Sequence, residues 1–297
     1  MRRWIKRFAR GLYKLLPDKI YLKLIYYLNT GGRLSFRNPV TFNEKIQWLK
    51  VYQRDPKLTV LVDKYAVKEY VSDKIGSEYV IPTIGVWDHA DNIDCDELPD
   101  QFVLKCTHDS GSRVICQNKS QMDLDETKNR LEAALRRNYY WNGREWPYKN
   151  VTPRIIAEPY MGNFESKYLV DYKLYVFSGQ VKFTLAVTER DIGEKITFYD
   201  RNWELMPFRE RNYPCSQQNV PKPETYEQMI EIAEKLAEGL IFARVDLYEI
   251  SGKIYFGELT FFPTGGIQEF EPVEWNKILG DWIELPAQKT ALKNRGT

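Results

Sequence analysis

Two short stretches near the C-terminal end carry acidic and basic side chains at the alternating spacing of β-strands. They are residues 244–248 (RVDLY) and 257–260 (GELT). Side chains two residues apart share one face of a strand, so Arg244 projects with Asp246, and Glu258 with Thr260. If the two strands are neighbours, two carboxylates converge in a hard oxygen site suited to Mg²⁺. The alternative is an ion pair of Arg244 with Asp246 on the solvated face of a sheet.

A second stretch, residues 102–114 (FVLKCTHDSGSRV), places Lys105 at the end of an apolar strand, before a small polar loop. One fixed cation and several backbone N–H groups can surround a polyphosphate in such a loop. The stretch is not a Walker loop, and a lysine at a strand end is common, so the pattern alone does not decide for phosphate. His108 in the loop could bind a phosphate, act as an acid/base near neutral pH, or be merely solvated.

A third stretch, residues 158–162 (EPYMG), has an acidic residue at the end of a strand and a glycine turn behind it. Asp171 follows at the start of the next strand. Backbone groups at such a crossing could meet a nucleobase, and Asp171 could meet a ribose hydroxyl. Any entry to a hairpin has a similar sequence, so the stretch is not specific by itself.

The elements that must position these residues alternate between helix and strand without a strict βαβ rhythm. Thr41 and Glu44 have the spacing of a capping box, which predicts a helix to about Tyr52, and Thr59 could cap a second helix that ends near Gly76. Further helices are predicted over residues 124–137 and 224–238, and strands over 79–82, 102–105, 154–158, 172–177, 181–187, 242–248 and 254–256. This pattern predicts an α+β protein of several lobes rather than a doubly wound sheet.

Composition limits the class of protein. The chain has 297 residues, of which 43% are hydrophobic and 28% charged, which excludes disordered, collagen-like and disulfide-stapled proteins. The four cysteines and two histidines show no zinc spacing. No charge-free stretch exceeds ten residues, whereas a membrane-spanning helix needs about 20. Because the first residues also lack a secretory signal, we expect the protein in the cytoplasm.

Basic charge is concentrated at the N-terminus. Residues 1–28 have a net charge of +7, which leaves −5 for the rest of the chain. Apolar residues recur there at helical spacing, which predicts an amphipathic helix on an anionic membrane surface, on a partner, or on the protein's own domain. Nucleic acid is a poor candidate partner because the remaining chain is acidic and has no basic stripe. The apolar positions are Trp4, Ile5, Phe8, Leu12, Leu15 and Leu16.

Taken in order, these stretches resemble the ATP-grasp superfamily. More closely, residues 38–50 (NPVTFNEKIQWLK), 63–68 (DKYAVK), 98–106 (LPDQFVLKC) and 171–173 (DYK) resemble the TupA-like (teichuronopeptide biosynthesis) ATP-grasp family. The resemblance covers about residues 20–280. It implies an ATP-grasp fold in which two α+β lobes hold the nucleotide. The expected parts are an N-terminal helical region over 1–30, a first lobe with the phosphate loop over 31–157, and a second lobe with the metal site over 158–297.

The resemblance also implies roles for individual residues. Lys64 and Lys105 would hold the phosphates of ATP, under a flexible loop that includes Thr107, Ser110, Gly111 and Ser112. Glu158, Tyr160 and Met161 would form the hinge where adenine lies, Asp171 would contact the ribose, and Lys173 would also belong to the nucleotide site. Asp246 and Glu258 would bind Mg²⁺, with Thr260 where many members have Asn, and Arg244 would lie beside the transferred phosphoryl group.

The implied activity is that of an ATP-dependent carboxylate ligase. A carboxylate attacks the γ-phosphate, and an amine or another nucleophile opens the resulting acyl phosphate. The resemblance points to cell-surface polysaccharide assembly, with a sugar acid or a glycan-linked carboxylate as acceptor.

Two other classes of function stay open at this point. One is a glycosyltransferase that uses a nucleotide sugar, with metal-binding D-x-D pairs at Asp94/Asp96 or Asp123/Asp125, although Asp125 is better explained as a helix cap. The other is a non-catalytic nucleotide-binding module on the membrane. The presence of both lysines, both carboxylates and Arg244 argues against the second.

Overall fold

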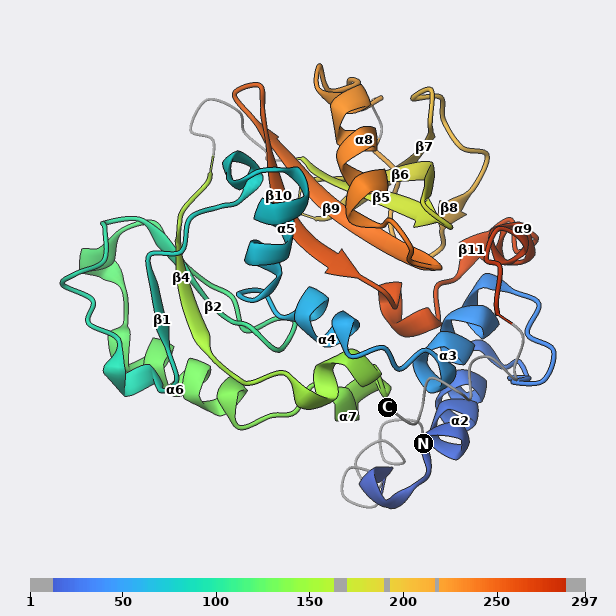
Figure 1. Ribbon diagram of the computed structural model, residues 1–297, viewed down its shortest axis with the longest axis horizontal. Helices are drawn as coiled ribbons and strands as arrows, with labels where there is room; N and C mark the ends of the chain where they lie inside the picture. The colour runs from blue at the N-terminus through green and yellow to red at the C-terminus, as the bar shows by residue number, and fades with distance from the viewer. Residues whose placement is uncertain (1–12, 163–169, 190–192, 217–218, 287–297) are drawn as a thin grey trace.

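The computed structural model describes residues 13–162, 170–189, 193–216 and 219–286. Its strands form two larger antiparallel sheets and one small sheet (Figure 1). The first sheet has the order β1 (Gly85–Trp87), β4 (Ile155–Pro159), β2 (Phe102–Cys106), β3 (Val114–Cys116). The second has the order β10 (Lys253–Thr260), β9 (Phe242–Ile250), β5 (Asp171–Phe177), β6 (Gln180–Thr188), β7 (Lys195–Asp200), and the small sheet pairs β11 (Phe270–Glu271) with β8 (Arg209–Glu210).

Helices cover the sheets and connect them. The α-helices are α2 (Asp18–Thr30), α3 (Phe42–Tyr52), α4 (Lys57–Val62), α5 (Val67–Ile75), α6 (Leu124–Leu135), α7 (Tyr140–Gly143), α8 (Tyr226–Leu236) and α9 (Trp275–Asp281). Short 3-10 helices are η1 (Tyr13–Leu15), η2 (Ser77–Tyr79), η3 (Ala90–Asn92), η4 (Lys119–Gln121), η5 (Trp146–Asn150) and η6 (Pro263–Gly266). Figure 1 shows α4 and α5 between the two larger sheets, and α8 across the five-stranded sheet.

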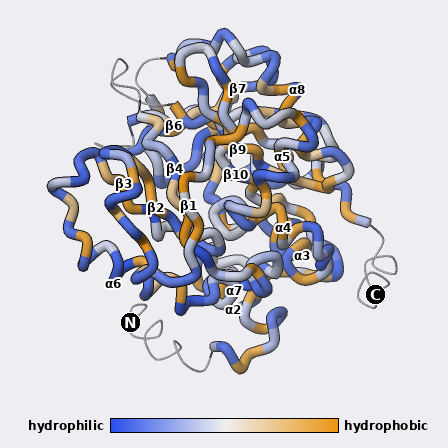
Figure 2. Tube along the Cα trace, turned by 60° about the vertical axis from the view of Figure 1, so that its left-hand side comes forward, coloured by the Kyte–Doolittle hydropathy of each residue, from blue (hydrophilic) through white to orange (hydrophobic). Residues whose placement is uncertain are grey.

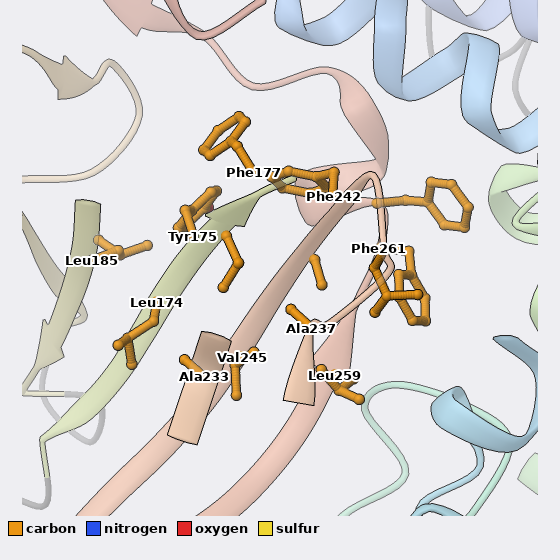
Figure 3. Close-up of a cluster of buried hydrophobic side chains, with 14 of the residues drawn as sticks. Leu174, Tyr175, Phe177, Leu185, Ala233, Ala237, Phe242, Val245, Leu259 and Phe261 are labelled. Carbon is orange, nitrogen blue, oxygen red and sulfur yellow. The ribbon is translucent and has the colours of Figure 1, made fainter. Parts of the chain in front are cut away.

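The five-stranded sheet has one apolar face, which packs against α8. Leu174 on β5, Val245 on β9 and Leu259 on β10 pair in register on that face (Figure 3). The hydrophobic colour in Figure 2 accordingly follows α8 and the strands beneath it. Side chains alternate along a strand, so the residues on either side of these three must project from the opposite face. The second face is apolar where Phe177 and Phe242 pack on Phe42 of α3, and it carries polar groups farther along the same strands.

A second, smaller core fixes the phosphate-loop lobe. Phe102 and Leu104 of β2 are fully buried with Ile155 of β4 and Leu131 of α6. The alternation along β2 turns Val103 and Lys105 away from this core. Lys105 is thus directed out of the small lobe by the packing of its neighbours.

Most predicted elements are confirmed, and two are wrong. The capping box exists, because Thr41 and Glu44 exchange side-chain to backbone hydrogen bonds of 3.3 and 3.0 Å. The helix predicted from Thr59 to Gly76 is instead two helices, since the Asp63 carboxylate accepts from backbone N–H groups just beyond it and starts α5. The strand predicted over residues 79–82 is also absent: η2 occupies its start, and the strand β1 begins only at Gly85.

The predicted N-terminal helix is only partly within the described residues. Trp4, Ile5, Phe8 and Leu12 lie outside them, and the helix α2 starts after Pro17. Residues 21–71 share one hydrophobic core with residues 172–283. The predicted boundary between the first and second lobes, after residue 157, stays a prediction. Of the helices that the structure describes, none is long and apolar enough to cross a membrane.

Candidate nucleotide and metal site

Six side chains form two rows on the face of the large sheet that α8 leaves uncovered. In one row Lys173 (β5), Asp246 (β9) and Glu258 (β10) are cross-strand partners. In the next row Tyr175, Arg244 and Thr260 are cross-strand partners. The sequence prediction that Arg244, Asp246, Glu258 and Thr260 converge is confirmed.

Arg244 holds this cluster together. Its Nε and Nη2 donate to Oδ1 and Oδ2 of Asp246, each at 2.7 Å, in a bidentate pair. Nη2 also donates to Oε1 of Glu258 at 3.2 Å and to Oγ1 of Thr260 at 3.1 Å. Asp246 is only 1% exposed, so the alternative of a surface ion pair does not hold. A buried bidentate guanidinium of this kind fixes the direction of the carboxylate that it grips.

Lys173 is the second cation on Asp246. Its Nζ lies 2.6 Å from Oδ2 of Asp171 and 2.5 Å from Oδ2 of Asp246, and all three residues are buried. Asp171 and Lys173 thus form an ion-pair chain that leads to the carboxylate of Asp246. The contact of Asp171 with ribose stays a prediction.

Lys64 lies between the phosphate loop and the large sheet. Its backbone N–H donates to the carbonyl oxygen of Thr107 at 3.0 Å, and its Nζ donates to the carbonyl oxygen of Asp109. Burial by itself raises the pKa of Glu258, but Lys64, Arg244 and Lys173 outweigh it and lower that pKa to about 2. Lys64 therefore joins loop 107–112 electrostatically to the proposed metal ligand.

The loop itself is held from within. Ser112 Oγ accepts from the backbone N–H of Cys106 at 2.9 Å and donates to Oδ1 of Asp109 at 2.6 Å. Ser110 and Gly111 form an exposed tip, where Gly111 has a φ of +99° that other residues rarely adopt. The base of the loop is therefore held by side-chain hydrogen bonds, and its exposed tip is in contact with Arg130, which donates to the Gly111 carbonyl at 3.4 Å.

His108 is not brought to the polar rows. Its ring is buried, with Nε2 3.2 Å from the carbonyl oxygen of Ala134 and 3.0 Å from that of Arg137. Ala134 lies in the last turn of α6 and Arg137 just beyond its end, and the Ala134 carbonyl also accepts from the Arg137 N–H at 2.9 Å. In this position His108 supports the helix end, and its role as an acid/base stays a prediction.

Lys105 pairs with Glu158, one of the three residues predicted to lie against adenine. Its Nζ lies 2.6 Å from Oε2 of Glu158, and Nζ of Lys68 lies 2.6 Å from Oε1 of the same carboxylate. Burial favours a raised pKa for Glu158, but Lys105 and Lys68 outweigh it and the pKa is lowered. Lys68 was missed from the sequence, although it lies four residues after Lys64 within the matched 63–68 stretch.

The two other residues predicted to lie against adenine, Tyr160 and Met161, come just before residue 162, where the first described range ends. The Tyr160 hydroxyl accepts from Nε2 of Gln117 at 2.9 Å, and Met161 is half-buried. Their contact with adenine stays a prediction.

A stripe of buried polar residues on α3 was also missed. Asn43, Gln47 and Lys50 lie at helical spacing, and each is at most 2% exposed. They donate to backbone carbonyls in residues 265–268, directly after β10: Nδ2 of Asn43 at 2.7 Å, Nε2 of Gln47 at 2.8 and 2.9 Å, and Nζ of Lys50 at 2.8 Å. The apolar periodicity of a helix cannot reveal such a stripe, because it reads as a solvated face.

The donor set fits a magnesium ion that keeps some of its waters. Asp246 and Glu258 supply two carboxylates, while the described residues contain no group of three His, Cys, Asp or Glu that could hold a metal by itself. Mg²⁺ is commonly held by one or two carboxylates together with substrate phosphates. Asp246 and Glu258 would hold the ion, with Thr260 beside them, and the ion would neutralise phosphate charge when bound.

Comparisons with known proteins identify the family of this chain. The family model described as TupA-like ATP-grasp matches residues 44–284. The chain belongs to the TupA-like ATP-grasp family. The two larger sheets and their helices are therefore the fold of an ATP-grasp protein. No protein with a curated description matches the chain.

Several solved structures are similar to this ATP-grasp protein. A D-alanine-D-alanine ligase from Bacillus anthracis, complexed with ATP, has 16% identity and a TM-score of 0.44, with 80% of this chain and 66% of that chain covered. The corresponding ligase from Helicobacter pylori has 15% identity and a TM-score of 0.40, with 85% and 67% covered. A RimK domain ATP-grasp protein from Sphaerobacter thermophilus has 13% identity and a TM-score of 0.41, with 76% and 69% covered. This chain thus spans about two thirds of their length.

Proposed function

We propose that this chain is an ATP-dependent carboxylate ligase that forms an amide through an acyl phosphate. The observation that carries the proposal is the pair of polar rows on β5, β9 and β10, with Lys64 of the α4–α5 connection opposite Glu258. Two carboxylates, a bidentate arginine and lysines from both lobes are the groups that phosphoryl transfer needs, because that chemistry depends on positioning and on charge neutralisation.

Each group has a defined part in this proposal. Lys105 and Lys64 bind the phosphates of ATP, and Glu158 orients Lys105 by pairing with it. Asp246 and Glu258 hold Mg²⁺, and Arg244 neutralises charge on the transferred phosphoryl group. The acceptor carboxylate attacks the γ-phosphorus while the bond to the β-bridging oxygen breaks, which gives an acyl phosphate and ADP. An amine then attacks the acyl carbon and releases inorganic phosphate.

The proposed acceptor is a sugar acid or a glycan-linked carboxylate in cell-surface polysaccharide biosynthesis, as the family resemblance implies. Because ATP is the phosphate donor, the proposed reaction takes place in the cytoplasm.

The glycosyltransferase alternative has no support from the positions of its D-x-D pairs. Oδ1 of Asp94 accepts from the backbone N–H of Asp96 at 2.9 Å. Oδ1 of Asp123 accepts from the N–H of Glu126 at 2.8 Å and so caps α6, a role that the sequence assigned to Asp125. Both pairs are engaged in local turns and caps.

Trapping of the acyl phosphate tests the proposal. Purified protein is incubated with Mg-ATP, a panel of uronic acids or carboxylated oligosaccharides, and hydroxylamine, which opens an acyl phosphate to a hydroxamate. We expect hydroxamate and ADP in equal amounts with one class of acceptor. A parallel thermal shift with Mg-ATP and UDP-sugars checks the donor, since a ligand at 100 times its Kd stabilises by about 2.7 kcal/mol. Stabilisation by a UDP-sugar alone would overturn the proposal.

A further inference from the structure

The helix α2 is fixed to the body of the protein along one side. Tyr21, Leu22 and Tyr26 are buried in the main core. At its first residue, Asp18 pairs with Arg54 at 2.7 Å and accepts from the Tyr140 hydroxyl at 2.5 Å. The helix therefore cannot reorient independently of the lobe that carries it.

The other side of α2 exposes an apolar row. Ile20, Leu24 and Tyr27 are 54%, 44% and 58% exposed, and their spacing of four and three residues places them on one face. Leu15, just before the helix, is 78% exposed. Single exposed apolar residues are ordinary on a protein surface, but an aligned row on one helix is not explained by folding.

A basic row runs beside the apolar one. Lys19 and Lys23 are exposed, each one residue before a member of the apolar row, and Lys14 precedes them. The Nζ of Lys19 also lies 4.7 Å from the centre of the Tyr52 ring, and that of Lys14 lies 5.7 Å from the centre of the Trp141 ring. Asp18 is the single acidic residue of the segment 13–30, and it faces the body of the protein. The outer face of α2 thus combines apolar and cationic side chains without an anion. Figures 1 and 2 show α2 at the edge of the molecule.

We propose that this outer face of α2, formed by Leu15, Lys19, Ile20, Lys23, Leu24 and Tyr27, docks onto the surface of an anionic lipid bilayer. Apolar side chains beside lysines, with an amphipathic tyrosine, are the composition that lies at a lipid headgroup boundary. The charge pattern supports this partner, since residues 1–28 carry +7 and the rest of the chain −5. An anionic surface attracts the face and repels the remaining body, which orients the protein.

Docking has a consequence for the active site. The helix α2 packs beside α3, and α3 holds residues 265–268 through Asn43, Gln47 and Lys50. The polar rows are joined to α2 through this rigid connection. This consequence rests on the proposed function: a docked protein presents the polar rows at a constant angle to the bilayer.

Flotation of the full chain with vesicles, in the absence of nucleotide, tests this surface independently of the proposed catalysis. We expect binding to phosphatidylcholine vesicles that contain phosphatidylglycerol, loss of binding at high salt, and little binding to phosphatidylcholine alone. The affinity of the double variant Ile20→Asp/Leu24→Asp for these vesicles should be at least about tenfold lower, because the variant places anions at the headgroups. Lys19→Glu/Lys23→Glu should have the same effect. Val273→Asp is the matched control, since Val273 is 72% exposed outside α2.

The other outcomes show that something else binds this face of α2, or that nothing does. Equal binding by wild type and Ile20→Asp/Leu24→Asp overturns the proposal. If deletion of residues 1–12 abolishes binding while the α2 variants still bind, the bilayer contact belongs to the tail and not to α2. If light scattering shows a wild-type dimer that Ile20→Asp/Leu24→Asp converts to a monomer, and neither floats, the face binds a second copy. Thermal unfolding checks that each variant is folded.

Discussion

Nζ of Lys173 lies 2.5 Å from Oδ2 of Asp246, which faces it across β5 and β9. A proposed ligand of Mg²⁺ is therefore already paired with a buried cation. The bidentate contact from Arg244 reinforces this pairing. These two cations neutralise the Asp246 carboxylate, a part that a bound Mg²⁺ would share.

Removal of Lys173 should destabilise the protein strongly. In Lys173→Met the carboxylates of Asp171 and Asp246 lose their shared cation in a buried site, which typically costs about 3–5 kcal/mol. Urea unfolding followed by circular dichroism measures the loss. The double variant Lys173→Met/Asp171→Asn should recover part of the stability, because one of the two anions is gone. A single variant as stable as wild type contradicts the ion-pair chain.

Removal of the Lys105 ammonium should weaken nucleotide binding. Lys105→Ala should bind Mg-ATP at least about tenfold less tightly, since a charge-assisted contact to phosphate contributes about 1.5–3 kcal/mol. Isothermal titration gives the affinity. Lys253→Ala, an exposed lysine at the start of β10, is the control. Unchanged affinity in Lys105→Ala would remove the phosphate role of the loop.

Loss of the Glu258 charge should abolish turnover without unfolding the protein. Glu258→Gln keeps the shape of the side chain but removes the charge that Mg²⁺ requires, so Mg²⁺-dependent release of ADP should fall by about 10²-fold or more. The protein should still unfold cooperatively but at a lower midpoint, because the lowered pKa of Glu258 means that its charge stabilises the folded state. Glu238→Gln, an exposed carboxylate beside Lys74, is the matched control and should turn over normally. Full activity in Glu258→Gln rules out the metal role.

Lys50 should make stability depend on pH in the alkaline range. Burial lowers the pKa of Lys50 from 10.5 to about 8, with Glu145 opposing the shift. Between these values the folded state binds fewer protons than the unfolded state, so the free energy of unfolding rises with pH, by up to about 3 kcal/mol. The quantity to measure is the difference between wild type and Lys50→Met in urea at pH 8 and at pH 10. A difference that does not grow with pH contradicts the burial of the charge.

His108 should affect stability rather than catalysis. Its ring contacts the carbonyl oxygens of Ala134 and Arg137 at the end of α6. His108→Ala leaves these carbonyls without that contact and should cost about 1–3 kcal/mol. The pH profile of turnover should keep its shape. A lost ionisation near neutral pH in the variant would restore the acid/base role.

Local sequence patterns by themselves determined several secondary-structure elements and which side chains share a strand face. The alternation of residues 244–248 and 257–260 predicted that Arg244, Asp246, Glu258 and Thr260 share one face, and the structure confirms it. The capping box of Thr41 and Glu44 is likewise a property of four neighbouring residues. Strand period, helix caps and the spacing of a family motif are short-range features, so they can be read along the chain.

Partner choice was decided only by the tertiary structure. Lys173 was predicted from the family resemblance as a nucleotide-binding residue, and the structure shows that it also pairs with Asp171 and with Asp246, which is 73 residues away. Gln47 and Lys50 read as a solvated helix face, yet they hold carbonyls more than 200 residues away. A charged side chain takes whichever opposite charge or carbonyl the fold buries beside it, because desolvation makes an unpaired group costly. That neighbour is set by how the lobes pack, and the linear order of residues does not contain it.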